Sequence, residues 1–167
     1  MFTGLVEGRG RVQSFEPMDG WWRLVVKVPN TEGLELGASV AIDGACLTAV
    51  AVHGDEVGGH LVSGHVFDTG RIETVTKTGE TCDIHVAASA ETMRYIFEKG
   101  YIAISGISLT VGLCEGEGFF LHLIPETLAR TTLGSAKPGD RVNLEVDPIT
   151  VAAVETVERI KAQEALA

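Results

Sequence analysis

Two short segments of the chain place a thiol and a hydroxyl at equivalent positions. Residues 44–48 read Gly-Ala-Cys-Leu-Thr and residues 106–110 read Gly-Ile-Ser-Leu-Thr, so Cys46 corresponds to Ser108. Either group could activate a nucleophile or pass a proton. The alternative is that small residues at a strand turn permit close packing. The sequence around Cys46 has no basic residue, which favours packing over a covalent role.

Two histidines lie five residues apart in the segment Gly-Gly-His-Leu-Val-Ser-Gly-His, which spans residues 58–65. On a strand this spacing puts His60 and His65 on opposite faces, which argues against a shared metal ion. The internal repeat described below aligns His65 with apolar Leu5. An imidazole in only one of two similar pockets would make them chemically unequal and would suit proton transfer. The alternative is a hydrogen-bonded structural histidine.

Several other residues have both a structural and a functional reading. Asp147 precedes Pro148 and is placed to cap a helix, which is compatible with a second role in a site. Lys99 is either a solvated charge or a ligand contact. Gly4 and Gly64 suit tight turns or a close approach of the backbone, but no phosphate-binding pattern with a following Lys-Ser or Lys-Thr is present.

The chain contains two copies of one unit. Residues 3–12 return as residues 63–72, and residues 40–49 return as residues 102–111 with five of ten positions identical. Copy one ends near Val57, whereas copy two continues through a segment, residues 119–147, that has no earlier counterpart. By comparison with copy two, about 30 to 35 residues are absent from copy one. We therefore predict an incomplete first domain (1–57), a second domain (58–147) and a terminal helix (148–167).

Short β-rich segments separated by glycine-containing turns predict antiparallel strands that close into small barrels. The expected strands are 5–6, 22–28, 39–52, 65–74, 82–86, 101–113, 119–124 and 141–146. The expected helices are 90–99 with Ser89 as N-cap, a turn at 125–128, and the terminal helix with an apolar stripe that suits a partner chain.

The bulk composition excludes several classes of protein. A net charge of -10 and a pI of about 4.9 argue against binding to nucleic acid or anionic lipid, which needs clustered lysine and arginine. No signal-peptide pattern is present, and no apolar run approaches the roughly 18 residues of a membrane span, so we expect a cytoplasmic protein. Three widely spaced cysteines support neither disulfides nor a structural zinc site.

Five ordered motifs span nearly the whole chain: residues 1–6, 44–48, 58–65, 99–112 and 122–134. Together they closely resemble the riboflavin synthase alpha-chain family. The resemblance implies an all-β chain of tandem six-stranded Greek-key barrels, the first truncated here, with a C-terminal α-helix that joins three chains into a homotrimer. It also implies association with lumazine synthase.

The reaction implied by the resemblance is dismutation of two molecules of 6,7-dimethyl-8-ribityllumazine, one of which donates a four-carbon unit to the other. The products are riboflavin and 5-amino-6-ribitylamino-2,4-pyrimidinedione. Neither an external cofactor nor a metal is implied, because the conjugated ring of the substrate acidifies its own C7 methyl group. The protein would hold two ligands face to face, and orientation can supply part of the roughly 7–11 kcal/mol available to well-placed reactants.

In the family the site lies between the first barrel of one chain and the second barrel of a neighbour. The polar residues that match catalytic positions are Ser39, Cys46, His65, Ser108 and Asp147. The residues that match ligand-lining positions are Gly4, Leu5, Val6, Cys46, Leu47, Thr48, Gly64, His65, Val66, Lys99, Ser108, Leu109, Thr110, Leu123, Ile124, Pro125, Glu126, Thr127 and Leu128. Our working hypothesis is that His65 assists C7-methyl deprotonation, while Ser39 or Cys46 helps deliver a nucleophile to the other lumazine.

Two departures from the family pattern leave alternatives open. Ser105 stands where the family commonly has a carboxylate or an amide, while copy one keeps Asp43 there. The segment missing after Val57 would remove the last strands of the first barrel and open a sheet edge. A non-catalytic lumazine- or flavin-binding protein is therefore the alternative to the enzyme, and a purely structural oligomer is a third reading.

Overall fold

The computed structural model of the chain describes residues 2–4, 6–17, 22–31, 34–35, 37–49, 59–62 and 64–165. Its strands are β1 (Phe2–Gly4), β2 (Arg11–Pro17), β3 (Trp22–Lys27), β4 (Ser39–Ile42), β5 (Ala45–Thr48), β6 (Gly59–Val62), β7 (Asp68–Thr78), β8 (Thr81–Ala87), β9 (Tyr101–Ile104), β10 (Ile107–Glu115), β11 (Gly118–Leu123) and β12 (Arg141–Val146). Its helices are α1 (Ala90–Met93), α2 (Pro125–Arg130), the 3-10 helix η1 (Thr132–Ser135) and α3 (Pro148–Glu164).

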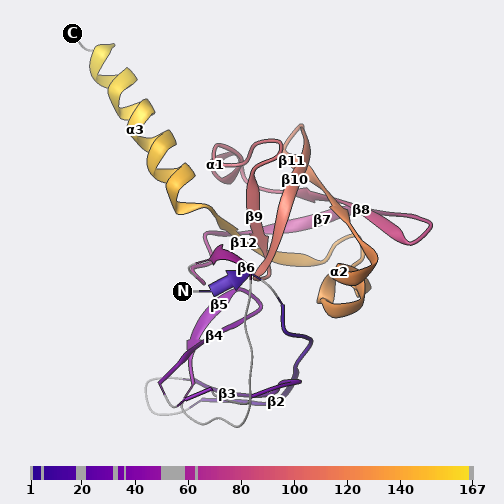
Figure 1. Cartoon of the computed structure of the whole chain (residues 1–167). Coiled ribbons are helices and arrows are strands. Elements are labelled where there is room, and N and C mark those ends of the chain that lie inside the picture. The colour runs from indigo at the N-terminus through magenta and orange to yellow at the C-terminus, as the bar shows by residue number, and fades with distance from the viewer. Residues whose placement is uncertain are drawn as a thin grey trace.

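The second copy forms a closed barrel of antiparallel strands in the order β10-β11-β8-β7-β12-β9 (Figure 1). Alternation along the strands builds its core, because successive side chains of a strand point to opposite faces. Along β8, for example, Cys82, Ile84 and Val86 are buried while the residues between them are partly exposed. Each strand contributes to the core, which includes Ile72, Ile84, Ile102, Val111, Leu121 and Leu144. The six-stranded barrel predicted for this half is confirmed.

The described strands of the first copy form two hairpins and not a closed ring, and a comparison with the barrel of copy two explains this. In that barrel β11 lies between β10 and β8, and β12 lies between β7 and β9. Copy one repeats β7 to β10 as β2 to β5 but ends before any counterpart of β11 and β12. Removing these two strands from the ring leaves two separate hairpins. The described residues of copy one show this arrangement, with β2 paired to β3 and β4 paired to β5.

The open half leaves apolar side chains in solvent that the closed half buries. Val12 of β2 is 57% exposed, whereas Ile72, its counterpart in β7, is 1% exposed. Phe15, further along β2, is 61% exposed. A barrel core needs residues from all its strands, so the exposure of Val12 agrees with the loss of the inner surface on which Ile72 packs in copy two.

The two halves meet at equivalent tight turns. Asp43 and Gly44 join β4 to β5, and Ser105 and Gly106 join β9 to β10; all four residues have positive φ, as a type I′ hairpin turn requires. The two glycines also touch. A Cβ atom on Gly44 would lie 2.8 Å from the Gly106 nitrogen, and one on Gly106 would lie 2.9 Å from the Gly44 nitrogen. Any larger residue at either position would therefore separate the halves.

The helix expected over residues 90–99 is shorter in the structure. Ser89 caps its start as predicted, accepting a hydrogen bond from the Thr92 amide at 3.2 Å. After Met93 the hydrogen-bond pattern changes, because the amides of Tyr95 and Ile96 donate to carbonyls three residues earlier instead of four. The α-helix therefore ends at Met93, and the chain reaches β9 through turns that the helical periodicity did not reveal.

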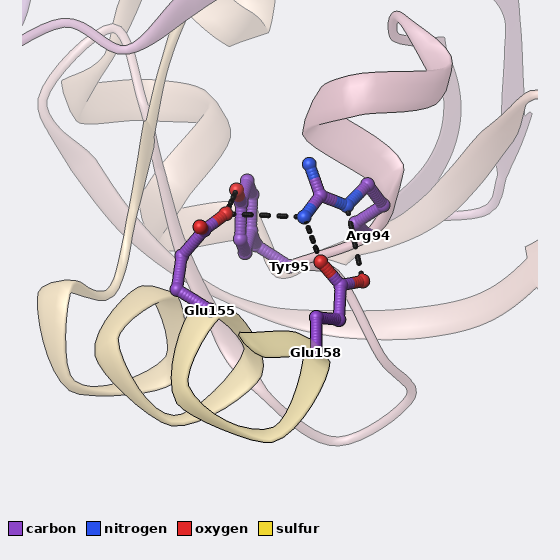
Figure 2. A network of polar contacts seen from close by, with 4 residues as sticks. All are labelled: Arg94, Tyr95, Glu155 and Glu158. Atoms are coloured by element: carbon purple, nitrogen blue, oxygen red, sulfur yellow. Dashed lines mark hydrogen bonds and ion pairs between the residues drawn. The ribbon is translucent and has the colours of Figure 1, made fainter. Parts of the chain in front are cut away.

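Helix α3 leaves the barrel at Asp147 and projects away from it (Figure 1). Polar contacts tie its first turns to the segment after α1 (Figure 2). Arg94 forms ion pairs with Glu155 at 3.0 Å and with Glu158. The Tyr95 hydroxyl donates to Glu155, and this hydrogen bond lowers the pKa of Glu155 and raises the pKa of Tyr95. None of the described helices is long and apolar enough to cross a membrane.

Candidate functional site

The predicted site residues meet in a crossed arrangement, in which the glycine segment of each copy contacts the hairpin of the other. The Cys46 amide of copy one donates to the Gly64 carbonyl of copy two at 2.8 Å. Conversely, Gly4 of copy one lies against Ser108 of copy two, so closely that a Cβ atom on Gly4 would be 2.6 Å from the Ser108 Cβ atom. We call these places the Cys46 corner (Cys46, Gly64, His65 and Val66) and the Ser108 corner (Gly4, Val6 and Ser108).

The β4–β5 hairpin presents a row of polar side chains beside the Cys46 corner. Cys46 is an exposed free thiol on β5, opposite Ala41, and Thr48 is opposite Ser39. Because directly opposite residues of an antiparallel pair share a face and alternate residues of one strand do too, Ser39, Cys46 and Thr48 lie on one face of this hairpin. Leu47 belongs to the other face and is also exposed.

The loop that carries His65 is held on both sides. The Gly64 amide donates to the Glu145 carboxylate at 3.1 Å, and the Phe67 amide donates to the Leu144 carbonyl at 2.8 Å. The Phe67 ring also packs edge-on against Tyr95, with ring centroids 5.4 Å apart. His65 and Val66 lie between these fixed points and are exposed. An imidazole at this position is accessible to a ligand, while its backbone is restrained.

Asp68 continues this restraint into β7. Its carboxylate accepts hydrogen bonds from the hydroxyls of Thr92 at 2.5 Å and Ser89 at 2.7 Å. These bonds favour the ionised form, and they lower the pKa of Asp68. The start of β7 is thereby joined to the start of α1.

The Ser108 corner lies on the outside of the closed barrel. Leu109 packs against the core, so Ser108 and Thr110 on either side of it point outward. Lys99 is exposed, has a φ of 64°, and donates its amide to the carbonyl of Val111, which lies on the same strand as Ser108. Val6 of copy one packs against the barrel core, while Leu5 lies outside the described residues.

Residues 123–128 divide between the core and the surface. Leu123 is buried at the end of β11, whereas Ile124 is exposed and precedes Pro125, the first residue of α2. Glu126, Thr127 and Leu128 belong to α2. Because Val111 is opposite Leu121, the antiparallel register brings the end of β11 toward Leu109. The end of β11, directly before α2, thus lies beside the strand that carries Ser108.

Asp147 caps α3. Its carboxylate accepts from the amide of Thr150 at 2.9 Å and from the hydroxyl of the same residue at 2.8 Å. The capping role expected from the sequence is therefore present.

Sequence reasoning missed Glu145. Alternation along β12 places it on the outward face, between the inward-pointing Leu144 and Val146, where a carboxylate is ordinarily solvated. The Gly64 segment covers this position, and Glu145 is only 6% exposed. No local pattern could have revealed a cover that comes from 81 residues away.

Comparison with known proteins identifies relatives of both halves. The lumazine binding domain model matches residues 3–62 and again residues 63–147. Riboflavin synthase of Escherichia coli (strain K12) is 38% identical over 200 residues, which cover 97% of this chain and 94% of that protein. Riboflavin synthase of Chlamydia pneumoniae is 36% identical over 199 residues, covering 97% of this chain and 98% of that protein. Since these alignments are longer than the chain's own 167 residues, both relatives contain residues without a counterpart here.

Solved structures share the fold. The crystal structure of LumP complexed with 6,7-dimethyl-8-(1'-D-ribityl) lumazine has a TM-score of 0.76 and 20% identity, and the match covers 88% of this chain and 99% of that one. LumP complexed with riboflavin has a TM-score of 0.77 and 21% identity, covering 88% of this chain and 100% of that one.

Proposed function

Because the chain belongs to the lumazine-binding domain family, we propose that it is a riboflavin synthase, a transferase that moves a four-carbon unit between two molecules of 6,7-dimethyl-8-ribityllumazine. The observation that carries the proposal is its 33–38% identity, over nearly the whole chain, to proteins named riboflavin synthase. The same identity favours the enzyme over a non-catalytic lumazine- or flavin-binding protein. Riboflavin and 5-amino-6-ribitylamino-2,4-pyrimidinedione are the products.

Different polar side chains at the Cys46 corner and on the adjoining face of the β4–β5 hairpin would do different work on two bound lumazines. His65 of the Cys46 corner would take a proton from the C7 methyl group of one lumazine, and Ser39 or Cys46 would help deliver a nucleophile to the other. Ser108, the counterpart of Cys46, and Asp147 complete the proposed polar set. The side chains at and around these corners would hold the rings, so that orientation supplies part of the rate enhancement.

Incubation of the purified chain with the lumazine tests the function. We expect riboflavin fluorescence to appear, with two lumazines consumed for each riboflavin and each pyrimidinedione formed. Chromatography of the quenched mixture measures all three compounds, and a reaction without protein gives the uncatalysed background. Tight lumazine binding without riboflavin above that background would instead identify a binding protein.

We further propose that α3 joins three chains into a homotrimer. Val151 and Val154 pack against the barrel core, while Val157 and Ile160, 49% and 50% exposed, remain available to a partner. Substituting both exposed residues (Val157→Glu with Ile160→Glu) is expected to yield a monomer, because burying two carboxylates in an apolar contact is unfavourable. Analytical ultracentrifugation measures the mass. Thr156→Glu, which adds charge at a polar exposed position of the same helix, serves as control; a double variant that stays trimeric contradicts the proposal.

Three expectations remain predictions from the sequence. They are the domain division at residues 57 and 147, a cytoplasmic location, and association with lumazine synthase.

A further inference from the structure

Glu145 is a buried carboxylate on the outer face of the closed barrel. It belongs to β12, is paired with Ala103 of β9, and is 6% exposed. Removing a carboxylate from water is unfavourable unless hydrogen bonds replace the lost solvation. The burial of this carboxylate is therefore favourable only with hydrogen-bond donors around it.

One of those groups is the backbone of the Cys46 corner. Glu145 Oε2 accepts a hydrogen bond from the Gly64 amide at 3.1 Å, in a buried setting. Gly64 has a φ of 75°, a backbone conformation that is unfavourable for residues with a Cβ atom. Its carbonyl in turn accepts from the Cys46 amide at 2.8 Å. A continuous set of hydrogen bonds thus joins β12, the Gly64 turn and β5.

The same strand holds the loop on its other side. Leu144, the neighbour of Glu145, accepts from the Phe67 amide through its carbonyl at 2.8 Å. Only His65 and Val66 lie between the two residues that β12 restrains. The location of the imidazole relative to Cys46 is therefore set by two adjacent residues of one strand.

We propose that Glu145 is a positioning residue that fixes His65 and Cys46 in their reactive arrangement, an inference that rests on the proposed synthase function. Glu145 acts through the backbone of Gly64. Glu145 lies on β12, and copy one ends before a counterpart of this strand. The turn at Gly4, which is equivalent to the turn at Gly64, therefore has no equivalent of Glu145 in its own copy.

Two substitutions separate positioning from simple structural support. Glu145→Ala removes the acceptor and is expected to lower kcat by about 10²-fold, the size of effect produced by a displacement of about 1 Å in a reacting group, with KM little changed. Glu145→Gln keeps a carbonyl oxygen that can accept from Gly64, so it should restore most of kcat. Val142→Ala, a core substitution on the same strand, is the matched control and should keep wild-type kcat.

Equal losses of kcat in the alanine and glutamine variants, or an equal loss in Val142→Ala, would overturn the proposal. If Glu145→Ala does not fold, Glu145→Asp takes its place, because the shorter carboxylate is withdrawn from Gly64.

A second measurement does not depend on turnover. In protein with ¹³C-labelled histidine, we expect the ring resonance of His65, assigned by its loss in His65→Ala, to shift or broaden in Glu145→Ala but not in Glu145→Gln or Val142→Ala. An unchanged resonance in Glu145→Ala would refute positioning. A wild-type chain that forms no riboflavin would refute the proposed function instead, and the resonance would still decide the role of Glu145.

Discussion

Replacing His65 with alanine is expected to lower kcat for riboflavin formation by about 10²- to 10⁴-fold, the contribution typical of a positioned acid or base. His65 is exposed in a restrained loop beside Cys46, where it can reach a ligand without reorganising the backbone. An alanine cannot take the C7-methyl proton. Because ring contacts rather than this imidazole would provide most of the affinity, we expect the lumazine dissociation constant to change far less than kcat.

Steady-state kinetics and fluorescence titration of the lumazine measure the two quantities separately. His122→Ala is the matched control. His122 lies on β11 and pairs with Asp83 at 2.6 Å on an exposed surface, so its removal should affect stability little. Wild-type turnover in His65→Ala would exclude the proposed role, and so would parallel losses of turnover and affinity, which would indicate a binding contact.

Antiparallel strands that close into small barrels could be predicted from the residues because strand and turn patterns are local, whereas the number of six strands followed from the family resemblance. The apolar residues alternate along β8, and Cys82, Ile84 and Val86 share its buried face. The repeat also predicted the open first half, since it shows which strands are missing. The β segments expected at 39–52 and 101–113 are each divided into two strands by a tight turn, at Asp43-Gly44 and at Ser105-Gly106. High β propensity on both sides of such a turn does not reveal it.

The crossed contacts could not be predicted in the same way. The repeat shows that Gly4 corresponds to Gly64 and Cys46 to Ser108, but it does not say which glycine meets which hairpin. That pairing depends on how the halves dock, through contacts between residues far apart in the sequence. The burial of Glu145 could not be predicted for the same reason. It results from the docked Gly64 segment and not from the pattern of its own strand.

Restoring the missing strands is expected to close the first barrel. The repeat aligns Val57 with Phe119, so a copy of residues 120–147, followed by a short flexible linker, would be inserted after Val57. The inserted strands would occupy the gaps between the two hairpins of copy one. Val12 and Phe15 would then become buried, and each such side chain is worth about 1.5–3 kcal/mol when fully removed from water.

Hydrogen exchange and urea unfolding measure the closure. We expect the amides of β2 to β5 to gain protection, and the denaturant dependence of the unfolding free energy to increase, because more surface is buried in the native state. An insert of equal length made of glycine and serine is the control, since it has the same chain length but no strand to pair. Equal protection with both inserts would show that the hairpins do not accept the restored strands.

Measuring kcat/KM for the chain with the restored strands and for the glycine-serine control tests whether closure of the first barrel affects function. Dismutation requires two lumazines held face to face, so a complete first pocket should raise the apparent affinity for the second lumazine and increase kcat/KM. The glycine-serine insert should leave kcat/KM at the level of the natural chain. If closure leaves kcat/KM unchanged, then copy one already supplies everything that the first lumazine-binding unit contributes to the reaction. The parts present are the β4–β5 hairpin, with Ser39 and Cys46, and the turn at Gly4.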